Sequence, residues 1–367
     1  MKEVYFDNAS TALPIFKNNS HEYANPSTSH KLGVQAAQAI YQARKEFLRM
    51  AGCNKSDVVF TSGGTESNNL AIIGYALANK RNKICFYALP WAHPSVLEPM
   101  KHASSLGFGT SEALDVNNIS LKQDCNFISL PHVCHETGNI FDVEGIALKF
   151  KKINSKTVVH IDGVQGFCKE KLCLKNIDLY SFSSHKLHGP AGVGGLFIKK
   201  GVRLSPIMFG GKQEKGIRAG TENINGIICF TEAALYLYEN MEKFKEKVIK
   251  LKQEFLKIKS LLDGVTVNSH EAASPYILSL SFKDVLGEIL MNMLSEKGIY
   301  VSTGAACKTG DRNVPPLIKM GFGKETSDSS IRLGFSHYNT MEEVVYARDI
   351  IKECVESLRK VTVKKRR

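Results

Sequence analysis

Short apolar runs alternate with helical segments through the first two thirds of this 367-residue chain. Each run is followed by a polar or glycine-bearing turn. The runs occupy residues 84–88, 127–130, 157–161 and 179–182. Runs that are apolar throughout are typical of parallel strands buried on both faces of a sheet. Because helical patterns at residues 33–51 and 66–79 lie between or beside these runs, the sequence predicts an α/β layered domain.

The pattern changes near residue 230. One continuous helical pattern extends from about residue 231 to about residue 262 and is typical of a helix that leaves the large domain. Shorter strand-like and helical segments follow it. The strand-like segments are 279–282, 299–302 and 331–335, and the helical ones are 286–297 and 341–360. This second pattern predicts a compact α+β domain.

The composition is that of an ordinary globular protein, with 43% apolar and 23% charged residues. No segment approaches the roughly 20 consecutive apolar residues that a membrane span needs. Met1 is followed directly by Lys2 and Glu3, so we see no apolar signal segment at this end. We therefore expect a cytoplasmic protein that does not associate with membranes.

The net charge of +12 raises the question of nucleic-acid binding, and the nine cysteines raise the question of a metal site. The basic runs at residues 243–259 and 364–367 are best interpreted as the solvated face of a helix and as a tail. They lack the interleaved aromatic residues of a single-strand binder, so nucleic-acid binding is the weaker alternative. Scattered cysteines in a cytosolic chain are expected to be reduced. Because Cys168 and Cys173 form one isolated pair, we expect no metal site.

A lysine follows the last of the four apolar runs, in the segment Ser183-Ser184-His185-Lys186. Such a position lies beyond the carboxyl edge of the sheet, where α/β folds bind ligands. Partial desolvation lowers the pKa of a lysine there, so its neutral amine can form a Schiff base. A solvated loop lysine is the alternative for this segment taken alone. The glycine-rich residues 189–195 lead into a strand and depart from G-x-G-x-x-G, so they do not indicate a dinucleotide loop.

Two further segments place polar groups at the ends of apolar runs. Residues 61–69 contain two glycines, which free the backbone to approach an anion, and Thr65 with the following helix supplies hydroxyl and amide donors. This pattern is typical of a phosphate cradle, with an ordinary capped helix start as the alternative. Asp162 ends a buried run and needs a cationic partner, such as a protonated pyridine nitrogen. Gln165, three residues on, is placed to turn a donor toward the same ring.

Together these motifs resemble the class V aminotransferases of pyridoxal 5'-phosphate (PLP) fold type I, and within them the cysteine desulfurases of the NifS/IscS group. The similarity extends from residues 5–11 to the last helix. It depends on six motifs in a fixed order. They are Thr61 to Asn69, Asp162-x-x-Gln165, Ser183-x-His185-Lys186, Arg218 to Asn223, Ser302 to Cys307, and Ser329 to Arg332.

The resemblance implies a fold and a division into domains. It implies the PLP-dependent transferase fold type I, of the α/β class. The large PLP-binding domain, with a mainly parallel mixed sheet flanked by helices, would span residues 12–230. A smaller α+β domain that carries the catalytic cysteine loop would comprise residues 1–11 and 231–367.

The resemblance also assigns roles around the cofactor ring. Lys186 would hold PLP and later move the substrate's α-proton. Asp162 would pair with the pyridinium nitrogen, and Gln165 would bind the phenolic oxygen of the ring. His93 would stack on the ring face and assist proton transfer.

Further roles concern the phosphate and the substrate. Thr65, Ser183 and His185 would bind the phosphate. Thr221 would reach the phosphate in the neighbouring subunit, which implies a homodimer with shared active sites. Arg332 would bind the carboxylate of the L-cysteine substrate through its planar fork of donors.

Cys307 would be the nucleophile, in a glycine- and alanine-containing stretch whose composition allows a mobile loop. Its thiolate would attack the substrate's sulfur, so that alanine is released and a persulfide remains on Cys307. The long stretch from Cys307 to Arg332 resembles that of the long-loop desulfurases. It fits direct transfer of sulfur to an acceptor or iron–sulfur scaffold protein, with tRNA involved only indirectly.

The chain also departs from the family pattern. Residues 132–136 read His-Val-Cys-His-Glu where Asn-Asn-Glu is usual, which leaves open whether His135 replaces an asparagine that contacts the ring. Lys212 stands where glycine is typical, and the stretch between Thr11 and Asn25 is short. The alternatives are a selenocysteine lyase or other β-eliminating PLP enzyme, and a catalytically silent scaffold relative. Cys307 favours the desulfurase, because simple elimination needs no thiol.

Overall fold

The computed structural model describes residues 3–15, 24–53, 55–116, 121, 125–303 and 314–366. These residues divide into two compact units. The large unit comprises Leu13–His132 and Phe141–Glu239. The small unit comprises Met1–Ala12, Val133–Ile140 and Asn240–Arg367.

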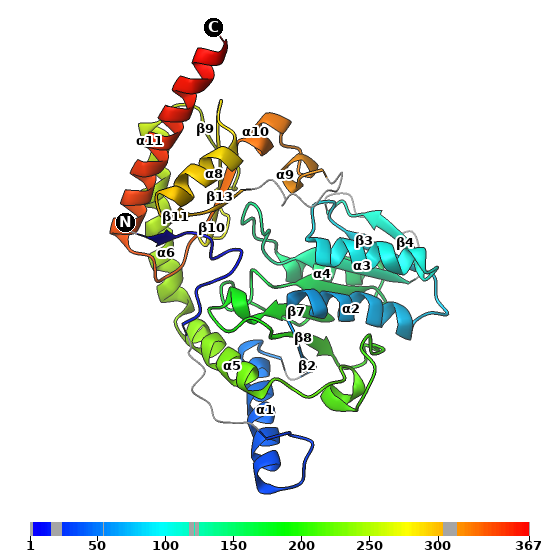
Figure 1. Ribbon diagram of the computed structural model, residues 1–367. Coiled ribbons are helices and arrows are strands. Elements are labelled where there is room, and N and C mark those ends of the chain that lie inside the picture. Colours follow the sequence, from blue (N-terminus) through cyan, green and yellow to red (C-terminus); the bar gives the residue numbers. More distant parts are fainter. Residues whose placement is uncertain are drawn as a thin grey trace. The chain divides into compact units, whose positions relative to one another are not determined.

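The large unit is built on a seven-stranded mixed sheet (Figure 1). From one edge to the other, its strands are β2 (Ser56–Thr61), β8 (Gly194–Lys199), β7 (Leu179–Ser183), β6 (Val158–Asp162), β5 (Asn126–Pro131), β3 (Ile84–Ala88) and β4 (Gly109–Ala113). Strand β8 runs antiparallel to both of its neighbours, and all the other pairs are parallel. The carboxyl ends of β5, β6 and β7 therefore lie at one edge of the sheet.

Helices cover both faces of this sheet. Because successive side chains of a strand point to opposite faces, Val59 packs with helices α2 (Gly64–Ala78) and α3 (Pro94–Ser105), whereas Phe60 contacts Phe47. Phe47 belongs to α1 (Lys31–Met50), which packs beside α5 (Ile224–Glu239), as Figure 1 shows. The ring of Phe47 lies 5.1 Å from that of Phe182 and 4.8 Å from that of Phe230. Each such fully buried ring contributes about 1.5–3 kcal/mol through burial.

The small unit contains two sheets. An antiparallel sheet has the order β12 (Ser302–Thr303), β13 (Ser330–Gly334), β10 (Ile277–Phe282) and β9 (Val265–Val267). A parallel pair joins β1 (Val4–Tyr5) to β11 (Ile299–Tyr300). An apolar core joins these strands to the longer helices of the unit, which are α6 (Met241–Leu256), α8 (Gly287–Glu296) and α11 (Met341–Arg366).

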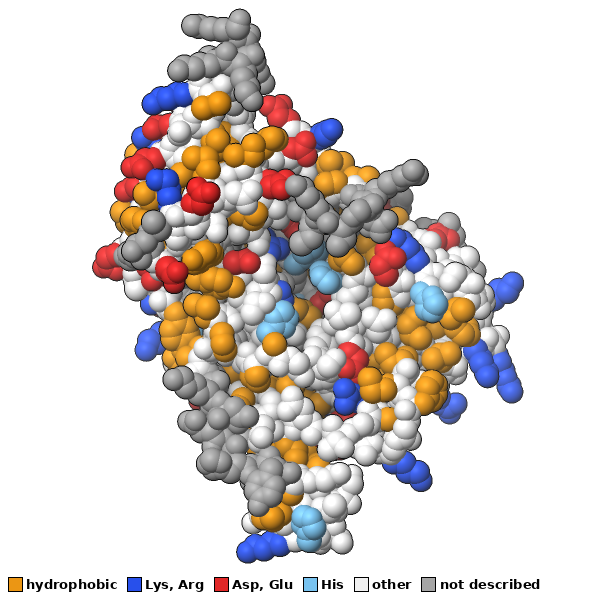
Figure 2. Space-filling view, viewed as in Figure 1, with side chains coloured by type: hydrophobic (Ala, Val, Ile, Leu, Met, Phe, Trp, Pro, Cys, Tyr) orange, Lys and Arg blue, Asp and Glu red, His pale blue; other side chains and the backbone are white. Residues whose placement is uncertain are grey.

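Short helices complete the two units. They are α4 (Val143–Ile153), α7 (Ile258–Leu261), α9 (Pro316–Lys319) and α10 (Lys324–Asp328). Across the described ranges, no helix is both long and apolar enough to cross a membrane. On the face drawn in Figure 2, Lys and Arg side chains are dispersed and do not gather into one patch.

The predicted fold class, a mainly parallel mixed sheet flanked by helices with a smaller α+β part, is confirmed. Two predicted elements differ. The helix expected over residues 231–262 is interrupted at Asn240, whose φ of −109° and ψ of 13° leave the helical range, and again at Lys257. The strand expected at 299–302 is two strands, because the chain changes pairing partner at Val301, from β1 to β13.

The division of the chain can also be compared with the expected domains. The boundaries fall between Ala12 and Leu13 and between Glu239 and Asn240. The expected boundaries were one residue and nine residues earlier. The segment Val133–Ile140, which the sequence placed in the large domain, belongs to the small unit.

Candidate active site

Two parallel strands bring an acid and a lysine to the same edge of the large unit's sheet. Strand β6 ends at Asp162, which is paired in register with Ser181 of β7. Strand β7 ends at Ser183 and passes directly into a 3₁₀ turn, Ser184–Lys186. Lys186 is half-buried, as is Asp162. The expected location of Lys186 just beyond a strand end is therefore the one observed.

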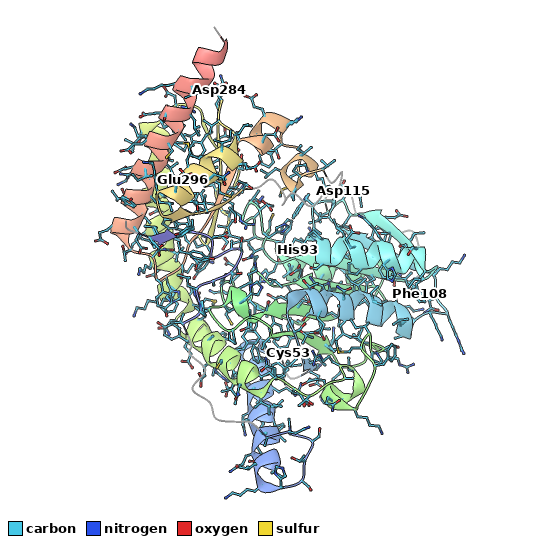
Figure 3. The ribbon with its side chains drawn as sticks, viewed as in Figure 1. Cys53, His93, Phe108, Asp115, Asp284 and Glu296 are labelled. Carbon is cyan, nitrogen blue, oxygen red and sulfur yellow. The ribbon has the colours of Figure 1, made fainter. Side chains whose placement is uncertain are left out.

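A chain of hydrogen bonds leads from Asp162 to His93 through two residues that the sequence did not single out. Asn68 Nδ2 donates to Asp162 Oδ2 (3.1 Å) and to Ser95 Oγ (2.8 Å). Ser95 Oγ lies 2.7 Å from His93 Nδ1, which also accepts from the Ser95 backbone N–H (3.1 Å). Because Nδ1 is an acceptor, a neutral His93 carries its proton on Nε2. His93 is exposed where α3 begins (Figure 3).

The other oxygen of Asp162 is also bonded. Asp162 Oδ1 accepts from the Val164 backbone N–H at 3.1 Å. These two donors fix the orientation of the carboxylate. Gln165 lies in the turn that follows and is 6% exposed.

The start of α2 forms a cradle next to the end of β7. A Cβ atom on Gly64 would lie 3.6 Å from Ser183 Cβ, so the two segments are in close approach. The residue that precedes the helix, Gly63, provides no side-chain cap to the first amides. The buried hydroxyls of Ser183 and Ser184 have no hydrogen-bond partner among the described residues. Exposed Thr65 adds a hydroxyl at the second position of the helix, so several donors at this point suit an anion.

His185 lies beside this cradle in an environment that keeps its ring neutral. Burial, together with the nearby cations Lys186 and Lys169, lowers the pKa of His185 to about 4. Burial also lowers the pKa of Lys169 to about 8. A neutral imidazole offers one N–H donor, which an anion in the cradle would attract.

Two ion pairs attach the loop after β8 to helices α1 and α2. Arg218 Nε donates to Glu66 Oε1 (2.9 Å) and Nη2 donates to Oε2 (3.4 Å). Glu66 Oε2 also accepts the Ser62 backbone N–H (2.7 Å). Arg44 binds both oxygens of Glu214, at 3.0 and 3.1 Å.

The second of these pairs protects the open edge of β2. Glu214 Oε2 accepts the Phe60 backbone N–H at 3.1 Å, and Arg44 Nη1 donates to the Val58 carbonyl. Both backbone groups face the unpaired side of the strand. Thr221 follows Arg218 in an exposed segment ahead of α5.

Arg332 lies in the small unit, on β13, and is 8% exposed. Its Nη1 donates to the His135 carbonyl (2.8 Å) and its Nη2 to Ser10 Oγ (2.7 Å). Two carboxylates approach it, with Asp7 Oδ1 and Glu136 Oε1 each 3.8 Å from a guanidinium nitrogen. Its Nε is buried and has no hydrogen-bond partner among the described residues.

The predicted cysteine, Cys307, lies outside the described residues. Burial raises the pKa of two other thiols, Cys134 and Cys168, which disfavours the thiolate that a nucleophile requires. His135 lies in the small unit, with its Nε2 3.5 Å from Glu136 Oε1.

The structure therefore brings most predicted cofactor residues to one region of the large unit. Those at the strand ends and at the start of α2 are Lys186, Asp162, Gln165, Thr65, Ser183 and His185, and hydrogen bonds link His93 to them. Glu66, Asn68 and Arg218 lay inside the motifs without an assigned role. Glu66 and Asn68 are polar residues in the first turns of a largely buried helix, and this was a signal that could have identified them.

Comparisons with known proteins give one consistent result. The family model for class V aminotransferases matches residues 4–346. A cysteine desulfurase IscS of Dictyoglomus turgidum is 31% identical, over 98% of this chain and 96% of that protein. A putative cysteine desulfurase of Bacillus subtilis, IscS 1, is 34% identical, over 98% of this chain and 100% of that protein. A solved structure described as a NifS-like protein superposes with a TM-score of 0.89 at 31% identity, covering 97% of this chain and 100% of that one.

Proposed function

The chain belongs to the class V aminotransferase family, in its cysteine desulfurase branch, and we propose on this premise that it is a PLP-dependent cysteine desulfurase. It would convert L-cysteine to L-alanine and retain the sulfur as a persulfide on Cys307. The observation that carries the proposal is the meeting of Asp162, Lys186 and the α2 cradle at one sheet edge, in a chain similar to cysteine desulfurases over nearly its whole length.

The residues of the large unit fit PLP. Asp162 is an acid that suits a pyridinium nitrogen, and its orientation is fixed by Asn68 and by the backbone of Val164. The unpartnered hydroxyl of Ser183 lies at the cradle, where a phosphate group would bind it. When bound, PLP supplies an electron-poor ring that can accept the electron pair released at the substrate's α-carbon.

The chain's own residues would perform the remaining steps. Lys186 would hold the cofactor covalently and carry the α-proton on Nζ. Lys186 is half-buried just beyond the end of β7. His93, with its proton on Nε2 and Nδ1 fixed by Ser95, would assist the proton transfer from one side.

Arg332 would bind the substrate's carboxylate, for which its buried Nε provides an unused donor. The Cys307 thiolate would form a bond to the substrate's sulfur while the carbon–sulfur bond breaks. The electron pair of the broken bond stays with carbon, which takes up a proton to become the methyl group of alanine.

We propose a homodimer, in which Thr221 reaches the phosphate held by the partner subunit. The apolar side chains Met208 and Phe209, which are 44% and 81% exposed in the same loop region, support a covered surface there. The persulfide would pass to an acceptor or scaffold protein, for iron–sulfur cluster assembly or tRNA thiolation. A reducing cytoplasm suits an enzyme whose nucleophile is a thiol.

The test is product formation from L-cysteine by purified wild type, Lys186→Ala and Cys307→Ala. Wild type should release alanine and, with a thiol reductant, sulfide. Cys307→Ala should keep the cofactor absorbance and lose alanine formation, whereas Lys186→Ala should lose both. Cofactor binding without action on cysteine, together with turnover of another amino acid, would show that the substrate is wrong.

A further inference from the structure

Arg332 is surrounded by more negative charge than one guanidinium can balance. Asp7 and Glu136 each place a carboxylate oxygen 3.8 Å from it, on opposite terminal nitrogens. If both carboxylates were ionised, the three groups would carry a net charge of −1. An anionic substrate approaching Arg332 would then meet a negative site, although its proposed role requires a positive one. Neutralising one of the two carboxylates would remove this excess of negative charge.

The two carboxylates differ in their surroundings. The side chain of Asp7 is 24% exposed, and its Oδ1 accepts a hydrogen bond from the Ser302 hydroxyl. The side chain of Glu136 is 10% exposed, and its Oε2 is buried with no hydrogen-bond partner among the described residues. Burial raises the pKa of Glu136, and Arg332 offsets part of this effect. A buried carboxyl with one unbonded oxygen takes up a proton more readily than an exposed, hydrogen-bonded one.

We propose that Glu136 is a specificity-determining carboxylate that competes with the substrate's carboxylate for Arg332. The proposal rests on the proposed role of Arg332 as the carboxylate-binding residue. When Glu136 is ionised it occupies Arg332, and anionic ligands bind weakly. When Glu136 is protonated, the net charge of the three groups rises from −1 to 0, and anionic ligands bind more tightly. Binding of a monoanionic carboxylate is therefore coupled to the uptake of one proton by Glu136.

The charged and titratable groups near Glu136 and Arg332 come from three segments of the small unit. Arg332 faces it from β13, and His135 and Cys134 belong to its own segment. Asp7, in the turn after β1, faces Arg332 from the other side. His135 Nε2 lies 3.5 Å from Glu136 Oε1, so its protonation also affects this site and needs its own control.

The competition has a reciprocal consequence. If ionisation of Glu136 weakens binding of a carboxylate, binding of that carboxylate must raise the pKa of Glu136 by the same factor. Binding is therefore accompanied by proton uptake at any pH where Glu136 is partly ionised. We expect a coupling of about one pKa unit, which corresponds to roughly a tenfold change in affinity between the two protonation states.

The experiment uses the PLP-loaded full chain and 3-mercaptopropionate as the probe, because this carboxylate has no amino group and so cannot form a Schiff base with PLP. Its Kd is measured by calorimetry at several pH values between about 5.5 and 8.5, in buffers with different enthalpies of ionisation, a range chosen to cover a carboxyl raised from its usual pKa. Wild type should show proton uptake and a Kd that rises about tenfold with pH. Glu136→Gln should show neither the proton uptake nor the rise in Kd. At high pH, its KM for L-cysteine should be lower than that of wild type, and its kcat should be the same.

Two variants serve as controls. Asp7→Asn removes the other carboxylate at the same distance and should leave the pH dependence in place. His135→Gln removes the imidazole and should also leave the pH dependence of Kd in place. The proposal is overturned if the ratio of wild-type to Glu136→Gln Kd does not change with pH, if His135→Gln alone abolishes the pH dependence, or if Glu136→Gln binds more weakly at every pH.

The proposal can be tested with wild type alone if Glu136→Gln does not fold. Binding of 3-mercaptopropionate without proton uptake across this pH range would contradict the competition between Glu136 and the ligand. Failure of the proposed function would look different. In that case L-cysteine would give no alanine, while the binding of 3-mercaptopropionate and its proton uptake would still report on Arg332 and Glu136.

Discussion

The Glu66–Arg218 pair is the contact through which the loop carrying Thr221 is attached to the phosphate cradle. We consider the replacements Glu66→Gln and Arg218→Gln, singly and together. Glu66 accepts three hydrogen bonds, two from Arg218 and one from the Ser62 backbone N–H at the start of the cradle. Loss of either partner should loosen the Ser62 end of the cradle and the segment before Thr221 at the same time.

The magnitude follows from burial and from the number of hydrogen bonds. The two side chains are 19% and 12% exposed. Removing one partner of a fully buried pair costs roughly 3–5 kcal/mol, and exposed pairs contribute about 0–1 kcal/mol. For this partly buried bidentate pair we expect about 2–3 kcal/mol for each single replacement. The double replacement should cost less than the sum, with a coupling of about 1–2 kcal/mol.

The assay is urea unfolding of the four proteins, together with their dissociation constants for PLP from the cofactor absorbance. PLP binding should weaken about tenfold in each single variant, a loss of ~1.4 kcal/mol. The exposed pair Glu46–Arg49 is the matched control, because it has one 2.7 Å contact at 51% and 37% exposure. Glu46→Gln should change the free energy of unfolding by less than about 0.5 kcal/mol and leave PLP binding unchanged.

The pH dependence provides a second check. Burial alone would raise the pKa of Glu66, but the hydrogen bonds from Arg218 and Ser62 outweigh it and lower the pKa. A lowered pKa means that the stabilisation is present above the usual value of about 4.3 and is lost as the pH falls further. The gap between wild type and Glu66→Gln should therefore close in acid. A coupling energy near zero, or PLP binding equal to that of wild type, would refute this account of the pair.

Three further predictions concern single side chains. Asn68→Leu removes the donor to Asp162 and should weaken PLP binding about tenfold in an absorbance titration, with no effect expected if this hydrogen bond were incidental. Burial lowers the pKa of His160 to about 3, so only the unfolded chain takes up this proton as the pH falls below about 6.5. Stability should then fall by ~1.4 kcal/mol per pH unit for this group, and His160→Gln should flatten the urea-derived slope by about one proton. Glu214→Gln should cost about 2–4 kcal/mol in urea unfolding, and a paired replacement, Arg44→Met with Glu214→Leu, should cost less than the single one because no charge is left buried alone.

Local sequence was sufficient for the elements of the large sheet. A strand that is buried on both faces must be apolar throughout, and such runs are short and bounded by turns. The break in the helix at Asn240 gave no such signal, because amphipathic spacing continues across it and the residue is neither proline nor glycine. The change of partner at Val301 was equally hidden. Which strand pairs with β11 and which with β12 depends on residues at both ends of the chain.

The same distinction between local and distant contacts applies to the candidate active site. Asp162 and Lys186 were predictable because their positions at strand ends give them an exposed edge of the sheet. Their supporting contacts were not predictable, because the partners are distant in sequence. Asn68 lies 94 residues from Asp162, and the His135 carbonyl lies 197 residues from Arg332. A motif identifies which side chains are present, but the direction in which each one donates emerges only from tertiary packing.

The charges at the large unit's sheet edge argue for a ligand with a cation at one end and an anion at the other. Asp162 presents a carboxylate whose bonded donors, Asn68 and Val164, are both uncharged, so its negative charge has not been neutralised by them. The α2 cradle presents the opposite polarity, with uncapped amides and the buried hydroxyl of Ser183. A simple phosphate would satisfy the cradle and leave Asp162 unneutralised, and a simple cation would do the reverse. A protonated pyridine that carries a phosphate would satisfy both, and this is the ligand that the proposed function requires.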